Sequence, residues 1–264
     1  MAKVGIIGIG NMGSAILKGL LKEYDKDDVI FTDVNKERCA QITEELGAAH
    51  ADTNAQCAGH AKYIVLAVKP QYFNPVLLDI RNVVTEKNVI ISIAPGITTA
   101  QLKEKLGDEK RVVRAMPNTP ALLGEGMTGV CYEEGAFSAE EKNAIGDIFR
   151  SMGKMRLVEE RLMNAVVCVS GSSPAYVYMF IEALADSGVK YGLPRDAAYE
   201  MAAQAVLGSA KMVLETGEHP GALKDKVCSP GGTTIAAVSA LEEFGFRNAV
   251  IKAGDACFKK CEEL

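Results

Sequence analysis

The sequence lacks the ligand patterns that mark common metal and disulfide proteins. It has no tryptophan and only three histidines, His50, His60 and His219, and none of its seven cysteines forms a CxxC pair. Because so few nitrogen and paired thiolate ligands are available, we expect no metal site. We interpret the odd number of cysteines as free thiols in a reducing cytoplasm, which predicts a cytoplasmic protein.

Long apolar runs and basic clusters are also missing. The apolar run at the N-terminus is short and glycine-rich, unlike a signal peptide. We find no apolar run of the roughly 18 residues that a membrane span needs. Acidic and basic side chains are mixed along the 264 residues, with a net charge of −5 and no basic stripe with interleaved aromatics. We therefore expect neither a membrane nor a nucleic acid as partner.

With 48% hydrophobic residues, the chain can bury a core, and its first part alternates two patterns. Short β-branched runs indicate strands, and stretches with helical apolar spacing separate them. This alternation predicts an α/β fold in which helices cover both faces of a doubly wound, mostly parallel sheet. We assign a Rossmann domain to residues 1–158, with strands at 4–10, 29–33, 63–68, 88–93, 111–116, 128–132 and 154–158.

Strand patterns end near residue 160, and the remaining segments all indicate helices. Several of these helices are apolar over more than one face, so they need burial on all sides, which a few helices of one chain do not supply. We therefore predict an all-helical dimerisation domain over residues 159–264. Its expected helices cover 162–171, 174–192, 194–217, 233–245 and 246–264.

A glycine-rich turn, Gly8 to Gly13, closes the first strand and opens a helix. In the pattern GxGxxG the first glycine permits a tight turn, the second lets backbone amides approach a pyrophosphate, and the third lets helix pack on strand. Asp33 ends the second strand and fits the ribose hydroxyls of NAD(H). The residues that follow, Asn35, Lys36 and Arg38, fit either a solvated helix start or a 2′-phosphate, so the choice between NAD(H) and NADP(H) stays open.

Three further loops follow predicted strands, at the edge where open α/β sheets bind ligands. They contain Lys69 with Pro70, Pro95 with Gly96, and Asn118 between two prolines. Any one of these loops could be an ordinary turn. Their shared position beside the glycine-rich turn favours a joint role in cofactor binding.

The segment VCSPGGTT, residues 227–234, interrupts the helical half. Ser229 and Pro230 fit an N-cap and first helical position, or a turn just before them. Two glycines then expose backbone amides, and Thr233 and Thr234 begin a helix. Such a helix start binds small anions, and the absence of arginine favours a carboxylate over a phosphate. The alternative is a glycine-rich turn between helices.

Motifs from the first strand to the last helix resemble one family. GIIGIGNMGSAI, LAVKP, VVRAMPNTPAL, VSGSSPAYVYMFIEALAD and GEHPGALKDKVCSPGGTTIAAVSALEE together resemble pyrroline-5-carboxylate reductase. The resemblance implies NAD(P)H-dependent reduction of Δ1-pyrroline-5-carboxylate to L-proline. It also implies a helical domain interlocked in homodimers, which often gather into decamers.

The resemblance also implies site residues. For the cofactor they are Ile7, Gly8, Ile9, Gly10, Asn11, Met12, Asn35, Asn54, Val68, Lys69 and Pro95, to which the patterns above add Gly13, Asp33, Pro70 and Asn118. For the substrate they are Ser229, Gly232, Thr233, Thr234 and Glu160. Family members often have asparagine where Lys226 stands, so the role of Lys226 stays open.

The chemistry of an imine agrees with these residues. A carbonyl-reducing dehydrogenase needs a proton donor, and the helix after SGSS contains no lysine or histidine before Lys190. A protonated iminium already carries its proton, so hydride addition needs mainly positioning and electrostatics. We predict that amides of residues 232–234 bind the ring carboxylate and that the Thr234 hydroxyl, as the catalytic residue, bonds the ring nitrogen. Glu160 either orients the substrate or caps a helix.

Two other functions were weighed. A hydroxyacid dehydrogenase would share the two-domain plan, but the missing lysine counts against it. A non-catalytic NAD(H)-binding protein would keep the glycine-rich turn, yet it would not need the hydroxyl-lined second site.

Overall fold

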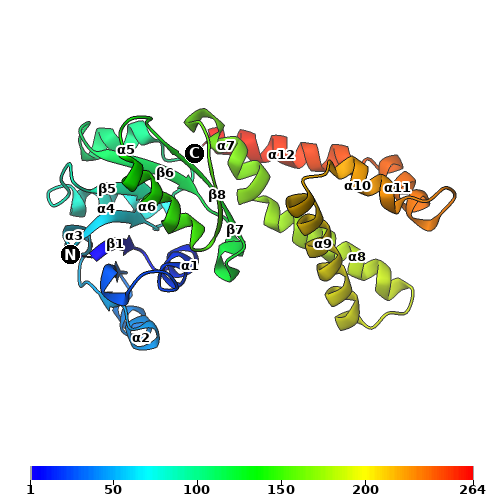
Figure 1. Ribbon diagram of the computed structural model, residues 1–264, viewed down its shortest axis with the longest axis horizontal. Coiled ribbons are helices and arrows are strands. Elements are labelled where there is room, and N and C mark those ends of the chain that lie inside the picture. The colour runs from blue at the N-terminus through cyan, green and yellow to red at the C-terminus, as the bar shows by residue number, and fades with distance from the viewer. Residues whose placement is uncertain (1, 264) are drawn as a thin grey trace. The chain divides into compact units, whose positions relative to one another are not determined.

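The computed structural model describes residues 2–263 and divides into two compact units (Figure 1). The first unit runs to Ser172 and includes the residues from Cys257 onward, and the second is Ser173–Ala256. These units are defined by contacts. The predicted border between residues 158 and 159 instead follows the change from strands to helices, and it stays a prediction.

The first unit is built on an eight-stranded sheet of order β3-β2-β1-β4-β5-β6-β7-β8. All neighbouring strands are parallel except β6 and β7, which are antiparallel. This confirms the predicted Rossmann-type sheet, although the two-residue strand β3 was not predicted. The strands are β1 (Ala2–Ile7), β2 (Val29–Thr32), β3 (Ala49–His50), β4 (Ala61–Leu66), β5 (Val89–Ser92), β6 (Arg111–Met116), β7 (Gly126–Tyr132) and β8 (Gly153–Leu157).

Helices cover both faces of this sheet, because alternate strand residues point to opposite sides. In β1, Ile6 belongs to a core shared with α1 and α6, whereas Ile7 belongs to a second core shared with α3, α4 and α5. The helices are α1 (Asn11–Leu20), α2 (Lys36–Leu46), α3 (Asn54–Gly59), α4 (Phe73–Ile80), α5 (Thr99–Leu106) and α6 (Ala139–Arg150), with short 3₁₀ turns η1 (Lys26–Asp28), η2 (Pro70–Tyr72) and η3 (Thr119–Leu123).

After β8 the chain stays in the first unit for three short helical segments. They are η4 (Glu160–Leu162), α7 (Met163–Val166) and the π-helical turn η5 (Val167–Gly171). Val166 of α7 packs so closely on β7 that a Cβ atom on Gly129 would lie 2.6 Å from its side chain. Glycine at this strand position therefore lets the helical segment approach the sheet.

The second unit contains helices only, and from Val158 to residue 263 the structure has no strand. Its helices are α8 (Ser173–Lys190), α9 (Arg195–Thr216), α10 (Pro220–Val227), α11 (Thr233–Glu243) and α12 (Phe246–Glu262), the last ending in the first unit. This confirms the predicted helical half, although α10 was not among the predicted helices.

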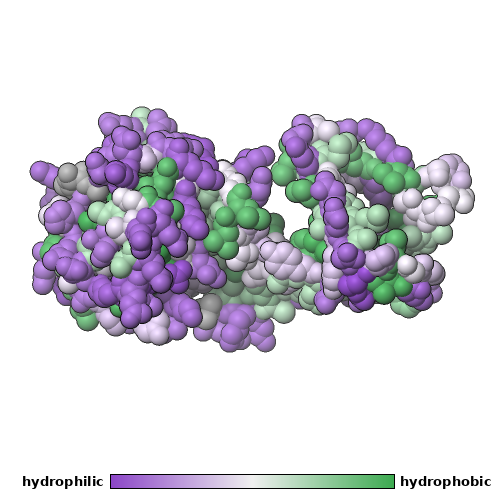
Figure 2. All heavy atoms as spheres, turned by 90° about the horizontal axis from the view of Figure 1, so that it is seen from below, coloured by the Kyte–Doolittle hydropathy of each residue, from purple (hydrophilic) through white to green (hydrophobic). Residues whose placement is uncertain are grey.

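The helical unit has almost no core of its own. Three alanines, Ala185, Ala198 and Ala202, form its buried cluster. Large apolar side chains lie on its surface instead, among them Met179 at 69% exposure and Phe244 at 85%. Figure 2 shows hydrophobic side chains gathered over this unit. An exposed apolar surface of this kind is typical of a protein-protein interface.

One helical run corrects the expectation about membrane spans. The run Glu160–Lys190 is long and apolar enough to cross a bilayer, by length and composition alone. Its helical segments are apolar on more than one face, which a dimerisation helix also requires. A single run of this kind is weak evidence for a membrane span.

Candidate functional site

The glycine-rich turn has the geometry that close backbone approach requires. Gly8 adopts φ +97°, a conformation that favours glycine. A Cβ atom on Gly13 would lie 1.9 Å from the Gly8 carbonyl oxygen, so α1 can pack on the turn only with glycine there. No heavy atom lies within 4 Å of the corresponding position on Gly10, the N-cap of α1. Gly10 therefore leaves room for a ligand at the helix start.

A cavity of about 500 Å³ opens beside this turn. It lies at the carboxyl ends of β1, β2 and β4, and β1 lies between the other two strands, where the strand order reverses. Open α/β sheets bind dinucleotides at this switch point. Its walls combine the glycine-rich turn with the loops after β2 and β4 and with residues of α2, α3, η2 and α4.

The cavity brings together about half of the predicted cofactor residues. Those that line it are Ile7, Gly8, Gly10, Asp33, Asn54, Val68 and Lys69. The others lie elsewhere: Ile9 is fully buried, Asn11 lines a neighbouring cavity, Met12 and Gly13 lie in the first turn of α1, Asn35 caps α2, Pro70 begins η2, Pro95 lies in the turn after β5, and Asn118 precedes η3.

Asp33 is held in place by backbone amides. Its Oδ2 accepts from the Ile9 amide at 2.7 Å, and its Oδ1 accepts from the Asn35 amide at 2.9 Å. The Lys36 ammonium does not pair with this carboxylate but donates to the carbonyls of Asp33 and Asp52, at 2.9 and 2.6 Å. The carboxylate thus has a fixed position in the cavity wall and links the glycine-rich turn to the start of α2.

The sequence patterns missed the wall that α4 and η2 supply. Tyr72, Pro75, Val76 and Asp79 line the cavity. Asp79 accepts a hydrogen bond of 2.9 Å from the amide nitrogen of Asn54. The only signal in the sequence was the helix that directly follows LAVKP, because its first turns must lie beside the preceding loop.

Asn118 joins two segments of the first unit. Its Nδ2 donates to the Ser170 carbonyl at 3.0 Å, and its Oδ1 accepts from the Met127 amide at 2.9 Å. Ser170 belongs to the π-helical turn η5. Both ends of the Asn118 amide are therefore used inside the protein, which fits a positioning role better than direct cofactor contact.

Glu160 lies at the start of α5 in space. Its Oε1 accepts from the Thr99 amide at 2.8 Å, and its Oε2 accepts from the Thr99 hydroxyl at 2.5 Å. The Arg114 guanidinium, 7% exposed, lies 3.5 Å from Oε1. Of the two roles considered for Glu160, these contacts favour capping of a helix.

The segment Ser229–Thr234 forms the start of α11 in the helical unit. The structure selects the turn: Pro230 and Gly231 form it, Gly231 has φ +66°, and Gly232 rather than Ser229 is the N-cap. Gly232 lacks a side chain that could accept from the first amides of the helix, and no side chain caps them. Thr234 is half-buried beside these amides, whereas Thr233 and Ser229 are exposed. The helix start can therefore bind an anion.

Lys226 lies close to this segment in the sequence and is paired with a carboxylate. Its ammonium forms an ion pair with Glu218. It also lines an apolar cavity of about 410 Å³ between α9 and α10. Its charge is therefore at least partly neutralised before any ligand arrives.

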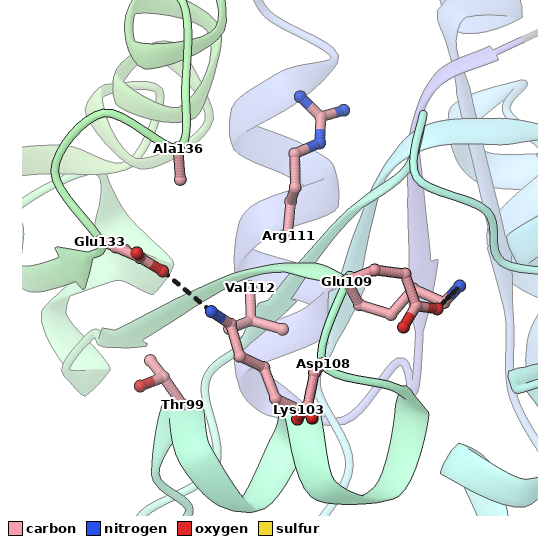
Figure 3. Close-up of a pocket in the computed structure, with 9 residues that line it drawn as sticks. Thr99, Lys103, Asp108, Glu109, Arg111, Val112, Glu133 and Ala136 are labelled. Carbon is pink, nitrogen blue, oxygen red and sulfur yellow. Dashed lines mark hydrogen bonds and ion pairs between the residues drawn. The ribbon is translucent and has the colours of Figure 1, made fainter.

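A second cavity of the first unit, of about 340 Å³, has a different character (Figure 3). Lys103 and Glu133 point toward one another across it and form an ion pair of 2.9 Å. Its other cations are paired as well, Lys110 with Glu109 and Arg111 with Glu141. Paired cations offer little to a pyrophosphate, so the cavity beside the glycine-rich turn is the better dinucleotide site.

Histidine, cysteine and carboxylate side chains do not gather into a metal-binding group anywhere in residues 2–263. None of the seven cysteines forms a disulfide bond. Burial raises the pKa of the Cys57 thiol to about 12, so this side chain remains a neutral thiol at physiological pH.

Family models and known proteins match both halves of the chain. Residues 160–264 match a model described as pyrroline-5-carboxylate reductase dimerisation, and residues 3–96 match one described as coenzyme F420-dependent NADP oxidoreductase. The pyrroline-5-carboxylate reductase of Escherichia coli is 48% identical over 99% of this chain and 98% of its own length. That of Pisum sativum is 40% identical over 99% and 95%.

Solved structures agree along the whole length. A pyrroline-5-carboxylate reductase from Coxiella burnetii superposes with a TM-score of 0.93 at 34% identity, covering 99% of this chain and 98% of its own. The Plasmodium falciparum pyrroline carboxylate reductase, solved with NADP bound, gives 0.86 at 33% identity over 99% and 97%. With relatives this similar over nearly its full length, the chain belongs to the pyrroline-5-carboxylate reductase family.

Proposed function

We propose that this protein reduces Δ1-pyrroline-5-carboxylate to L-proline with NAD(P)H, by hydride transfer to a protonated cyclic imine. The observation that carries the proposal is the 48% identity to a relative of that name over 99% of the chain. The dinucleotide cavity and the anion-binding start of α11 supply the two kinds of site that such a reaction needs.

The residues beside the glycine-rich turn fit a nicotinamide dinucleotide. The free space over Gly10 and the N-terminal amides of α1 suit the pyrophosphate, and Asp33 suits a ribose. The remaining proposed contacts are Ile7, Gly8, Ile9, Asn11, Met12, Gly13, Asn35, Asn54, Val68, Lys69, Pro70 and Pro95, whereas Asn118 has a positioning role. When bound, the reduced nicotinamide supplies the hydride.

The start of α11 binds the substrate in this proposal. The amides of Thr233 and Thr234 hold the ring carboxylate, and Gly232, whose own amide donates to the Ser229 carbonyl at 3.0 Å, leaves the helix start open to it. Ser229 contributes its hydroxyl at the edge of the site. The Thr234 hydroxyl accepts the N–H of the iminium and so places the electrophilic imine carbon. The iminium carries its own proton, so hydride addition at the imine carbon yields the neutral ring amine without a further acid.

Glu160 was also predicted to contact substrate. Its contacts with Thr99 and Arg114 support the capping role instead, so we propose that it acts on the fold rather than on the substrate.

An absorbance assay at 340 nm tests the proposed reaction. We expect the purified chain to oxidise NADH or NADPH with pyrroline-5-carboxylate, with proline as product by mass spectrometry, and not with hydroxyacid-pathway carbonyl substrates. Oxidation with the carbonyl substrates alone would identify a hydroxyacid dehydrogenase. Binding of the dinucleotide without any turnover would favour a non-catalytic binding protein.

We propose further that residues 159–264 form the homodimer and that dimers assemble into a decamer in the cytoplasm. The match of residues 160–264 to a dimerisation model and the exposed apolar side chains of the helical unit support the dimer. The absence of a disulfide bond among the seven cysteines supports a reducing compartment.

A further inference from the structure

The ribose end of the dinucleotide cavity contains one carboxylate in a fixed position. Asp33 lines the cavity at the end of β2, and each of its oxygens already accepts one backbone amide hydrogen. A carboxylate oxygen has two lone pairs, so each oxygen keeps one acceptor site. Two adjacent, fixed acceptors match the two hydroxyl groups of an unmodified adenosine ribose.

We infer that this chain selects NADH over NADPH and that the Asp33 carboxylate is the group that discriminates. The inference rests on the proposed function only in that a nicotinamide dinucleotide occupies this cavity. A 2′-phosphate has no proton to donate at neutral pH and brings negative charge against the carboxylate at hydrogen-bond distance. The hydrogen bonds from the two backbone amides prevent the Asp33 carboxylate from rotating away to relieve that repulsion.

The neighbouring cations do little to offset this charge. The Lys36 ammonium donates to two backbone carbonyls instead of the carboxylate. At the start of α2, Asn35 caps the helix with its own side chain, which accepts from the Arg38 amide at 3.0 Å and so removes one amide that a phosphate could use. The N-terminus of α2 therefore has fewer free amides with which to bind a phosphate.

Arg38 is the group that would favour the opposite selection. Arg38 lines the cavity, and its guanidinium makes a long contact of 3.4 Å with the Ser14 hydroxyl. An arginine near the ribose is the usual partner of a 2′-phosphate. The repulsion between the fixed Asp33 carboxylate and a 2′-phosphate thus outweighs the attraction that Arg38 would offer.

Isothermal calorimetry with two mononucleotides tests the inference on the full chain. We expect 5′-AMP to bind at least about 10-fold more tightly than 2′,5′-ADP, and NADH to bind more tightly than NADPH by a similar factor. Equal affinities, a preference for 2′,5′-ADP, or no binding of either mononucleotide up to millimolar concentration would overturn it.

Three substitutions then assign the selection to a residue. Asp33→Ser should reduce the preference for 5′-AMP by about 10-fold or more, because it removes the opposing charge. Glu37→Gln is the matched control, since it removes a carboxylate one turn away that does not line the cavity, and it should leave the ratio unchanged. Arg38→Ala should preserve or increase the preference for 5′-AMP.

Two results of these variants would contradict the inference: an unchanged ratio in folded Asp33→Ser, or a ratio that moves equally in Glu37→Gln. Thermal unfolding shows whether Asp33→Ser folds, and the comparison on the unsubstituted chain decides the cofactor selection if it does not. Mononucleotides contain no nicotinamide and need no imine, so failure to reduce pyrroline-5-carboxylate leaves this test intact. Reduction with a preference for NADPH would contradict only this inference.

Discussion

Thr234 illustrates how one hydroxyl can replace a catalytic acid. It begins α11 beside amides that no side chain caps, and it is half-buried. An iminium needs to be held and oriented rather than protonated, so a neutral hydroxyl that accepts one hydrogen bond is sufficient. This explains why the proposed substrate site contains no histidine.

Thr234→Ala should lower kcat/KM for pyrroline-5-carboxylate by about 10–100-fold, the effect of one lost hydrogen bond in a preorganised site. Steady-state kinetics measure it, and Thr234→Ser should restore most of the rate. Thr233→Ala is the control, because Thr233 is proposed to act through its backbone amide, and it should change kcat/KM less. Equal rates for Thr234→Ala and the unsubstituted enzyme would remove Thr234 from the mechanism.

Glu141 shows how a single buried carboxylate makes stability depend on pH. Burial alone would raise the pKa of Glu141, but hydrogen bonds from Arg111, the Ser138 amide and Lys62 lower it to about 2. A carboxylate with a lowered pKa stabilises the fold at pH values above its ordinary pKa, which is near 4.5. That stabilisation is lost as the pH falls from 4.5 through about 2.

Glu141→Gln should therefore lower the free energy of unfolding by about 2–3 kcal/mol at pH 7, and the difference should shrink below pH 4.5 and vanish near pH 2. Urea unfolding at several pH values measures this. Glutamine keeps an acceptor for the capping box with Ser138, so the change reports mainly on charge. Glu140→Gln, in the same helical turn, should have little effect; a deficit of Glu141→Gln that persisted at pH 2 would point to packing instead.

At the scale of elements, short polar contacts fix the loops around the sheet. Glu160 joins η4 to the start of α5 and to Arg114 of β6, while Asn118 joins the loop after β6 to the π-helical turn. These contacts connect segments that are 46 to 61 residues apart in the chain. They place the ends of the strands without lining the dinucleotide cavity.

Glu160→Ala should lower the free energy of unfolding by about 1–3 kcal/mol, because it leaves the buried Arg114 guanidinium without its carboxylate and the Thr99 amide at the start of α5 without its acceptor. Chemical denaturation measures this. Glu159→Ala is the control, since Glu159 forms only an exposed ion pair with Arg161, and such pairs contribute about 0–1 kcal/mol. A raised KM for the imine with unchanged stability would restore the substrate role of Glu160.

The periodic patterns predicted seven of the eight strands and most helices, because a strand that is buried on one or both faces shows its burial in the sequence. Strand β3 has only two residues, Ala49 and His50, too few to show any period. Helix α10 begins at Pro220 within a glycine- and proline-rich stretch that predicts turns equally well. Short elements formed by tertiary contacts leave little local signal.

The sequence predicted the cavity residues that belong to a motif. It did not predict those that reach the cavity only through the folding of the chain. Gly8, Gly10 and Asp33 follow a known spacing, and the structure places all three around the cavity. Asp79 and Tyr72 reach it because α4 folds back over the end of β4. The direction of the Asp33 carboxylate, and the loss of Lys36 to backbone carbonyls, depend on three-dimensional contacts that no spacing encodes.

On the scale of the whole molecule, the helical unit depends on another chain for its core. Its three buried alanines cannot offset the large apolar side chains on its surface. Burial of such side chains contributes about 1.5–3 kcal/mol each, so association is the main available source of stability for this unit.

Light scattering at micromolar concentration should therefore give a mass of at least twice the 28.2 kDa of one chain. The decamer would have ten times the mass of one chain. Replacement of both Leu207 and Leu214, 57% and 65% exposed, by glutamate should prevent association or unfold the helical unit. Replacement of the exposed Glu200 and Lys211 by glutamine in the same helix is the control. A folded monomer of the unsubstituted chain would contradict the prediction.

The return of α12 to the first unit has a consequence for synthesis on the ribosome. The first unit is completed by residues from Cys257 onward, where the Cys257 thiol contacts the Ser172 hydroxyl at 3.4 Å. Residues 173–256 are synthesised between the two segments of the first unit, so a nascent chain contains the whole sheet before the residues that complete this unit have been made. Nascent chains that stall inside α12 should therefore be cleaved by protease more readily than released ones.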